Sequence, residues 1–290
     1  MQIIINMACG LANRMFQYAY YLFLKKRGYN AVVDYYETAT LEHEKVAWNQ
    51  IFPEAQMKKA GRWEILKLGG GSSLFSKIRR RYLPMTCNVH YMSTAFSAEC
   101  PELSNKDRYI FGVFQNASMV DGVKEEVQQT FAFAPFEDER NIRLMQEMLQ
   151  CNSIGIHVRK GHDYMSRRWY QETCPLEYYQ KAIAYLKERV NNPIFYVFAD
   201  NPTWVKENFK DFNYKLVEGN PPAGWGSHFD MQLMSYCKHN IISNSTYSWW
   251  GAFLNRNPEK IVVLPHQWFN PKSCEESTCE KVKCDGWVAL

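Results

Sequence analysis

The second half of the chain alternates short apolar stretches with longer segments of helical periodicity. A strand, a helix and then another strand form the repeating unit of a parallel sheet covered by helices. The alternation therefore predicts a doubly wound α/β unit. We expect its strands at residues 153–158, 194–198, 240–242 and 261–264, and its helices at residues 177–190, 204–209 and 230–237.

The first half begins with the same pattern. Residues 3–6 predict a buried strand, a turn containing Gly10 follows, and residues 14–27 have the periodicity of a helix that Gly28 ends. Further segments indicate a second α/β unit, so we expect an N-terminal domain over residues 1–140 and a C-terminal domain over 141–290. These segments are strands at residues 31–34 and 109–114 and helices at residues 120–131 and 138–149.

Composition narrows the class of protein. The 290 residues are 46% hydrophobic and 22% charged, which is typical of a soluble globular protein. A net charge of +4 is too weak to indicate nucleic acid as a partner. The sequence contains no apolar run of about 18 residues, so we expect no membrane span. Nine scattered cysteines and an N-terminus that resembles a strand rather than a signal peptide favour a reducing compartment, so we expect a cytoplasmic protein.

Two local patterns leave alternatives open. Cys274, Cys279 and Cys284 recur every five residues, which fits free thiols in a surface tail better than a zinc site. A run of three arginines at residues 79–81 is typical of a solvated basic face. The alternative is contact with a charged acceptor or with the inner surface of a membrane, to which the protein would bind peripherally.

Polar clusters follow three of the predicted strands in the second half. His157, Arg159, Lys160 and Asp163 follow the first strand, and Asp200 follows the next. Because parallel strands end at one edge of a sheet, these clusters should lie together. Arg159 and Lys160 are suited to a phosphate, and Asp163 is either a base or a residue that orients Arg159. The alternative is a surface loop with an ordinary salt bridge.

The third cluster is a hydroxyl-rich turn within residues 237–255. Asn244, Ser245, Thr246 and Ser248 stand between a short apolar strand and an apolar helix that contains a Trp pair. A helix start of this kind directs main-chain N–H groups and a positive helix end at one point, which suits a phosphate. The same residues are common N-caps, and Asp230, which opens the preceding helix, is likewise either an N-cap or an acceptor for ring N–H groups.

Several standard nucleotide motifs are missing. The sequence has no G-x-x-x-x-G-K-[ST] and no G-x-G-x-x-G, which disfavours a P-loop hydrolase and a dinucleotide dehydrogenase. It also lacks a D-x-D, the usual carboxylate pair that holds a divalent ion on a sugar nucleotide. We therefore expect no metal site and no cofactor.

Five motifs in order resemble the inverting α-1,2-fucosyltransferases, chiefly their bacterial members, along almost the whole chain. They are G-L-A-N-R-M-F-Q-Y-A from residue 10, G-V-F-Q-N from 112, H-V-R-K-G-H-D-Y from 157, F-A-D-N from 198 and S-N-S-T-Y-S-W-W-G-A-F-L-N from 243. The resemblance implies two Rossmann-like domains facing a central cleft, the GT-B type. It also implies GDP-fucose as donor, a galactose-terminated glycan as acceptor and no metal.

The resemblance assigns roles to individual residues. Arg159 becomes the pyrophosphate ligand with His157 beside it, and Asp230 binds guanine. Both Arg159 and His157 are expected to be catalytic, with Asp163 as the first choice for the base. The other expected donor-binding residues are Lys160, Asp200, Asn244, Ser245, Thr246 and Ser248, and the residues expected on the acceptor side of the cleft are Asn13, Arg14 and Gln17.

The chain departs from the family pattern at several motif positions. Ala12, Arg14, Lys160, Ala199 and Asn201 replace residues that the family favours, and the intervening His162 displaces Asp163 by one position. The expected reaction is transfer of L-fucose from GDP-β-L-fucose to the 2-hydroxyl of a terminal galactoside with inversion. Transfer of another GDP-sugar, or a catalytically inactive homologue that binds carbohydrate or nucleotide, remain alternatives. The sequence indicates no oligomeric state.

Overall fold

The computed structural model describes residues 1–36, 48–100 and 106–290, and these divide into two compact units. The first unit is Met1–Ala134 and the second is Pro135–Leu290. The division precedes the boundary expected at residues 140 and 141, which would cut helix α7 (Glu139–Gln150). Asn141 of α7 donates to the Asn220 side chain of the second unit at 2.9 Å, so the whole helix belongs with that unit.

A four-stranded parallel sheet forms the centre of the first unit, in the order β2-β1-β4-β3. The central strand β1 is buried from Ile3 onward, as expected of a parallel strand that is covered on both faces. The strands are β1 (Gln2–Asn6), β2 (Asn30–Asp34), β3 (Val89–Tyr91) and β4 (Arg108–Phe111).

Helix α1 packs on this sheet through an almost continuous buried surface. Its Tyr20 ring stacks on Phe114 with centroids 4.0 Å apart. Gly28 adopts a φ of 83° and its N–H donates to Lys25 at 2.9 Å, so it ends the helix as the sequence predicts. The helices of this unit are α1 (Leu11–Lys26), α2 (Trp48–Ile51), α3 (Arg62–Leu68), α4 (Leu74–Tyr82), η2 (Pro84–Thr86), α5 (Ala117–Asp121) and α6 (Lys124–Thr130).

The second unit contains a six-stranded parallel sheet in the order β10-β9-β8-β5-β6-β7. All six residues of the central strand β5 are buried. Its neighbours are β8 and β6, with Ile156 paired to Ile241 and Val158 to Ala199. The strands are β5 (Ser153–Val158), β6 (Ile194–Ala199), β7 (Tyr214–Val217), β8 (His239–Ile241), β9 (Val262–Leu264) and β10 (Val288–Ala289).

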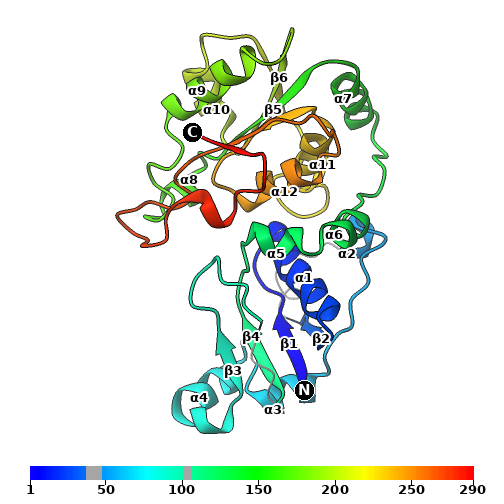
Figure 1. Cartoon of the computed structure of the whole chain (residues 1–290), viewed down its shortest axis with the longest axis vertical. Helices are drawn as coiled ribbons and strands as arrows, with labels where there is room; N and C mark the ends of the chain where they lie inside the picture. Colours follow the sequence, from blue (N-terminus) through cyan, green and yellow to red (C-terminus); the bar gives the residue numbers. More distant parts are fainter. Residues whose placement is uncertain (37–47, 101–105) are drawn as a thin grey trace. The chain divides into compact units, whose positions relative to one another are not determined.

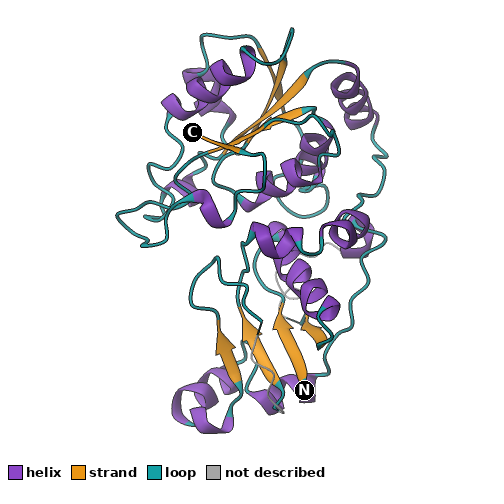
Figure 2. Cartoon of the chain, viewed as in Figure 1, coloured by secondary structure: helices purple, strands orange, loops and turns teal. Residues whose placement is uncertain are grey.

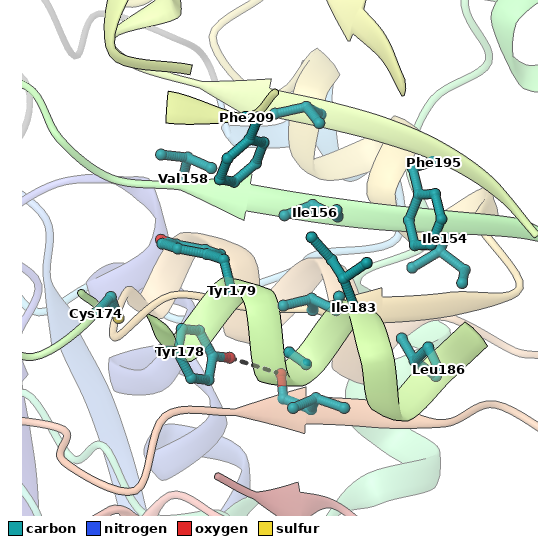
Figure 3. Packing of buried hydrophobic residues seen from close by; sticks show 14 of the residues in the cluster. Ile154, Ile156, Val158, Cys174, Tyr178, Tyr179, Ile183, Leu186, Phe195 and Phe209 are labelled. Atoms are coloured by element: carbon teal, nitrogen blue, oxygen red, sulfur yellow. Dashed lines mark hydrogen bonds between the residues drawn. The ribbon is translucent and has the colours of Figure 1, made fainter. Parts of the chain in front are cut away.

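Helices cover both faces of this sheet, with α9 and α10 on one side of β5 and β6 and α11 and α12 on the other. In Figure 3 the α9 side chains Tyr178, Tyr179, Ile183 and Leu186 lie against the strands, and the Tyr178 hydroxyl donates to Val263 at 3.2 Å. The helices are α7 (Glu139–Gln150), α8 (His162–Met165), α9 (Leu176–Lys187), α10 (Pro202–Asn208), α11 (Phe229–Tyr236), α12 (Thr246–Leu254) and η3 (Cys279–Lys281).

The structure corrects two sequence predictions of secondary structure. The helix expected over residues 120–131 is broken into α5 and α6, because Val123 leaves the helical conformation. The C-terminal segment is not a surface tail: it returns to the sheet as β10, and Cys279 is fully buried. Trp287 of this segment packs on Trp249 with ring centroids 5.6 Å apart, which explains why the segment stays against the domain.

Trp249 and Trp250 of α12 pack inside the domain, since both have no exposed surface. Their rings meet edge to face at 4.9 Å, and the Trp249 indole N–H donates to Val282 at 2.6 Å. These contacts hold α12 against the interior of its domain. Within the described residues, no helix has the length and apolar character that crossing a membrane requires.

Candidate functional site

The three polar clusters expected at one sheet edge are brought together there. Strands β8, β5 and β6 are neighbours and parallel, so the segments that begin at Ser243, Arg159 and Asp200 leave the same edge. This geometry follows from the topology alone. The contacts below show which side chains meet.

Asp200 fixes the two basic residues that follow β5. One carboxylate oxygen, Oδ2, lies 3.3 Å from Nη1 of Arg159, and the other accepts from the Lys160 N–H at 2.7 Å. The Arg159 guanidinium also lies 5.4 Å from the centre of the Tyr164 ring. Arg159 keeps a third of its side-chain surface exposed, so a held cation faces solvent at this edge.

The Lys160 side chain packs against protein groups rather than extending into solvent. Its ammonium lies 5.3 Å from the centre of the Trp204 ring, and burial lowers its pKa, an effect that Cys174 and Asp200 oppose. The Lys160 carbonyl accepts from Asn201 at 3.2 Å. This residue therefore packs against α10 and braces the loop that carries Arg159.

His157 is a buried, neutral residue at the end of β5. Its Nδ1 lies 2.8 Å from the Ser243 hydroxyl, which ties β5 to the turn after β8. Burial, with a smaller effect from the nearby Arg159 charge, lowers its pKa to about 3. His157 is consequently uncharged near neutral pH and acts through hydrogen bonding rather than as a cation.

Tyr164 and Asn244 connect α8 to the hydroxyl turn. The buried Tyr164 hydroxyl donates to the Asn244 main-chain carbonyl at 3.0 Å and also bonds the Asn244 side chain. The Asn244 amide in turn donates to Trp268 at 3.0 Å, and its oxygen accepts from Cys174 at 3.4 Å. The polar groups of Asn244 therefore form hydrogen bonds within the protein, and these bonds hold the conformation of the turn.

Helix α12 starts at this turn and presents the expected N-terminus. Ser245 is its N-cap by position, but its side chain makes no cap hydrogen bond. The Ser248 hydroxyl is fully buried and donates within the turn to Ser245 at 3.2 Å. The N-cap hydroxyl, Thr246 and the first main-chain N–H groups of a nine-residue helix therefore form the part of the turn suited to an anion.

Asp230 lies in the first turn of α11, not at its N-cap, which is His228. Its Oδ1 accepts from Asn220 at 2.7 Å, and burial raises the pKa of the carboxyl, an effect that this bond and Arg140 oppose. Asn220 thereby holds Asp230 in place from the loop before α11. The expected N-cap alternative for Asp230 is wrong.

Tyr247 joins Asp230 to the rest of the edge. Its hydroxyl accepts from the Met231 N–H at 2.8 Å and donates to Ser227 at 2.8 Å. Its ring lies 5.8 Å from the His157 ring. Burial raises the pKa of the Tyr247 hydroxyl, the Asp230 charge raises it further, and the Arg159 charge lowers it. Tyr247 therefore links candidate nucleotide residues of α11, α12 and β5.

The N-terminal candidates are described within their own unit. The Gln17 side chain accepts from Ala8 and donates to Gly112, each at 2.9 Å, so it joins the ends of β1 and β4. Arg14 is buried and donates to the Tyr35 hydroxyl at 3.2 Å, and Asn13 accepts from Gln115 at 3.2 Å. Asn13 is the most exposed of the three candidates.

Asp163 falls within α8, but its side chain lies outside the described part of the chain. Sequence reasoning missed Tyr164, Tyr247 and Asn220, because their partners Asn244, Ser227 and Asp230 come from other segments and no local pattern predicts such contacts. The quoted motifs contained both tyrosines, and that is the signal by which they could have been found.

The chain is similar to known glycosyltransferases. The model of the family "Glycosyl transferase family 11" matches residues 90–290. The O-antigen biosynthesis glycosyltransferase WbnK of Escherichia coli is 28% identical over 97% of this chain and 98% of that protein. The alpha-1,2-colitosyltransferase of E. coli is 31% identical over 63% of each chain. The galactoside alpha-(1,2)-fucosyltransferase 2 of Gorilla gorilla gorilla is 27% identical over 46% of this chain and 40% of that protein.

A solved structure shows the same fold. The NodZ alpha-1,6-fucosyltransferase soaked with GDP-fucose superposes with a TM-score of 0.51 at 13% identity, covering 87% of this chain and 92% of that one. The predicted fold class, α/β with two Rossmann-like units of the GT-B type, is confirmed, while the cleft expected between them stays a prediction. Together with the family match over residues 90–290, this means that the chain belongs to glycosyl transferase family 11.

Proposed function

We propose that this glycosyltransferase moves L-fucose from GDP-β-L-fucose to the 2-hydroxyl of a terminal galactoside, with inversion and without a metal ion. The observation that carries the proposal is the position of Arg159. Asp200 holds this cation at the sheet edge from which the α12 N-terminus also starts, and His157 and Tyr164 join the two segments. A diphosphate needs this combination of a fixed guanidinium and a helix N-terminus.

The reaction forms one bond and breaks another at the anomeric carbon. The acceptor hydroxyl oxygen attacks that carbon from the face opposite the diphosphate, the carbon–oxygen bond to the diphosphate breaks, and GDP leaves with the electron pair. Arg159 and the first N–H groups of α12 stabilise the charge that develops on GDP. Ser245 and Thr246 add hydroxyl donors, while Lys160 acts chiefly by bracing the loop.

A carboxylate takes the proton of the acceptor hydroxyl, and Asp163 is our first choice for it. The neutral His157 does not supply charge: its Nδ1 is engaged by Ser243, so it positions the turn beside the diphosphate. Asp230, held by Asn220, is the acceptor for the guanine ring N–H groups. Asn13 is the acceptor-side candidate that its own contacts leave most accessible.

The relatives support this choice of substrates. WbnK, which matches along nearly the whole chain, is named for O-antigen biosynthesis, so we propose a bacterial surface glycan as the acceptor. The gorilla relative is named for transfer to a galactoside with an alpha-(1,2) linkage. Together these names favour a galactose-terminated glycan.

A second candidate is transfer of a different sugar from the same nucleotide. The observation in its favour is the 31% identity to an alpha-1,2-colitosyltransferase, a match that covers 63% of this chain. The third candidate, a homologue that only binds nucleotide or carbohydrate, is motivated by the departures at Ala12, Lys160 and His162.

One assay separates the three candidates. The full chain is incubated with GDP-fucose and a panel of β-galactosides, with and without EDTA, and both GDP and the glycan product are measured. We expect a fucosylated product whose yield EDTA does not change. Nucleotide-linked colitose competing as the better donor would select the second candidate, and GDP binding without any product would select the third. Loss of activity in EDTA would overturn the metal-free mechanism.

A further inference from the structure

An unusual surface lies on α4 and η2 of the first unit, far along the chain from the candidate site. Six large apolar side chains are exposed there, and Met85 is 96% exposed. We call them the α4 apolar face. They are Leu74, Phe75, Ile78, Tyr82, Leu83 and Met85.

The helix is amphipathic in the reverse of the usual sense. At about 100° per residue, Leu74, Phe75, Ile78 and Tyr82 fall within an arc of about 100° on one side of α4. The opposite side carries Ser76, which is the one residue of the helix to be buried. A helix that only covered a protein core would direct the apolar arc inward.

Two arginines explain how α4 stays attached without burying its apolar arc. Arg80 donates from Nη1 to the carbonyls of Gly69 and Gly71 at 2.5 and 2.8 Å. Arg79 donates to Leu66 at 2.5 Å and to Lys67 at 3.1 Å, at the end of α3. The expectation of a solvated basic face is therefore wrong for these two arginines, since they bind main-chain carbonyls.

Two further cations lie next to the apolar arc. Lys77 and Arg81 are exposed, and by helical periodicity they border the arc on one side. Residues 55–98 contain eight Lys and Arg and one acidic residue, Glu64, a net charge of +7. The whole chain has a net charge of +4, so the rest of it carries −3. The positive charge of the protein is concentrated in the segment that exposes the apolar residues.

We propose that α4 and η2 dock on the surface of an anionic lipid bilayer. Apolar side chains beside exposed Lys and Arg are the combination that inserts a helix into the headgroup region while its cations meet anionic lipids. In Figure 1 α4 lies beside β3 at an end of its own unit, and its apolar side chains are exposed within the part of the chain that the structure describes. The charge of residues 55–98 favours this occupant over a second copy of the chain, because two such segments would repel each other.

Sedimentation with vesicles tests the proposal on the full chain. We expect binding to phosphatidylcholine vesicles that contain about one-third phosphatidylglycerol, little binding to pure phosphatidylcholine, and weakening by salt. Phe75→Ser with Ile78→Ser should reduce binding at least tenfold, and so should Lys77→Glu with Arg81→Glu. Both variants should keep the wild-type thermal unfolding midpoint, since Ser76, Arg79 and Arg80 are unchanged.

Matched controls lie in the second unit. Lys181→Glu with Lys281→Glu makes the same change in net charge at exposed positions, and Leu149→Ser removes an exposed apolar side chain. These variants should bind vesicles as the wild type does. Equal binding to neutral vesicles, or equal losses in the controls, would overturn the proposal. So would a dimer that depends on Phe75 and Ile78 in a chain that ignores vesicles, an outcome that would assign the α4 apolar face to a second copy.

Discussion

Asp200 should act on catalysis only through Arg159, and a double-mutant cycle can measure this. Its Oδ2 lies 3.3 Å from the Arg159 guanidinium, and its Oδ1 accepts from the Lys160 N–H at 2.7 Å. Asp200→Asn keeps an acceptor for that N–H but removes the charge that orients the guanidinium. Arg159→Ala removes the proposed diphosphate ligand itself. Asp200→Asn therefore tests the contact between Asp200 and Arg159, and Arg159→Ala tests the proposed contact between Arg159 and the diphosphate.

The expected magnitudes differ because the two residues stand at different distances from the reaction. Loss of a donor that stabilises developing charge typically costs about 3–4 kcal/mol, so Arg159→Ala should lower kcat about 10²–10³-fold. The side chains of Arg159 and Asp200 are 34% and 17% exposed, so solvent screens their ion pair. A pair of this kind contributes about 1 kcal/mol, and Asp200→Asn should lower kcat about fivefold.

The double variant distinguishes orientation from a direct role. If Asp200 only positions Arg159, adding Asp200→Asn to Arg159→Ala should change kcat less than about twofold, because nothing remains to be oriented. The assay is steady-state GDP release at saturating donor and acceptor. Arg189→Ala, which removes an exposed arginine that pairs with Glu188 on the far end of α9, is the matched control and should leave kcat unchanged.

Additive effects would refute the reasoning. A further fivefold loss in the double variant would mean that Asp200 contacts the substrate or the reacting atoms itself. Near-normal turnover of Arg159→Ala would remove Arg159 from the mechanism altogether.

Three further predictions concern stability. Burial lowers the pKa values of His157 and His228 to about 3 and about 4, below the 6.5 of the unfolded chain, so the unfolded state binds more protons between these values. Their contribution is complete above pH 6.5 and is lost as the pH falls. Near pH 5 the two together give a slope of about 2.7 kcal/mol per pH unit, which urea unfolding at several pH values should detect and His157→Gln should halve. Gly251→Ala should destabilise by about 1–3 kcal/mol, because its Cβ would lie 2.9 Å from that of Met234; an unchanged melting temperature would contradict this approach of α11 and α12. Asn255→Ala should cost about 2–4 kcal/mol in chemical denaturation, since the buried amide donates to a main-chain carbonyl at 2.6 Å, and a loss below 1 kcal/mol would refute that role.

Local pattern was sufficient for the elements that carry the site. All six residues of β5 are buried, and its alternating Ile154, Ile156 and Val158 are typical of a strand. Parallel topology then places Arg159 and Asp200 at one edge. Periodicity failed where packing partners decide the outcome. The C-terminal segment returns to the sheet as β10, and its Trp287 packs on Trp249, which stands 38 positions earlier in the chain.

Residue type and family resemblance did not predict side-chain partners. Arg159, His157 and Asp230 were assigned nucleotide roles that stay predictions, and what each one touches depends on residues far along the chain. Tyr164 forms a hydrogen bond with Asn244, which lies 80 positions further along the chain, and no local sequence pattern predicts a pair at that separation. The same limit applied to Arg79 and Arg80, where a basic run predicts solvation but nearby carbonyls capture both guanidinium groups.

The start of α12 joins the two interpretations that the sequence left open. Ser245 occupies the N-cap position with extended dihedral angles, as a helix start requires, while its hydroxyl makes no cap hydrogen bond. The turn is instead held from outside, by His157 on Ser243 and by Tyr164 on Asn244. Because neighbouring residues fix the backbone, the N-cap hydroxyl is not needed to stabilise the helix. It is available to an anion together with the first main-chain N–H groups, so one turn can be both a helix cap and a phosphate site.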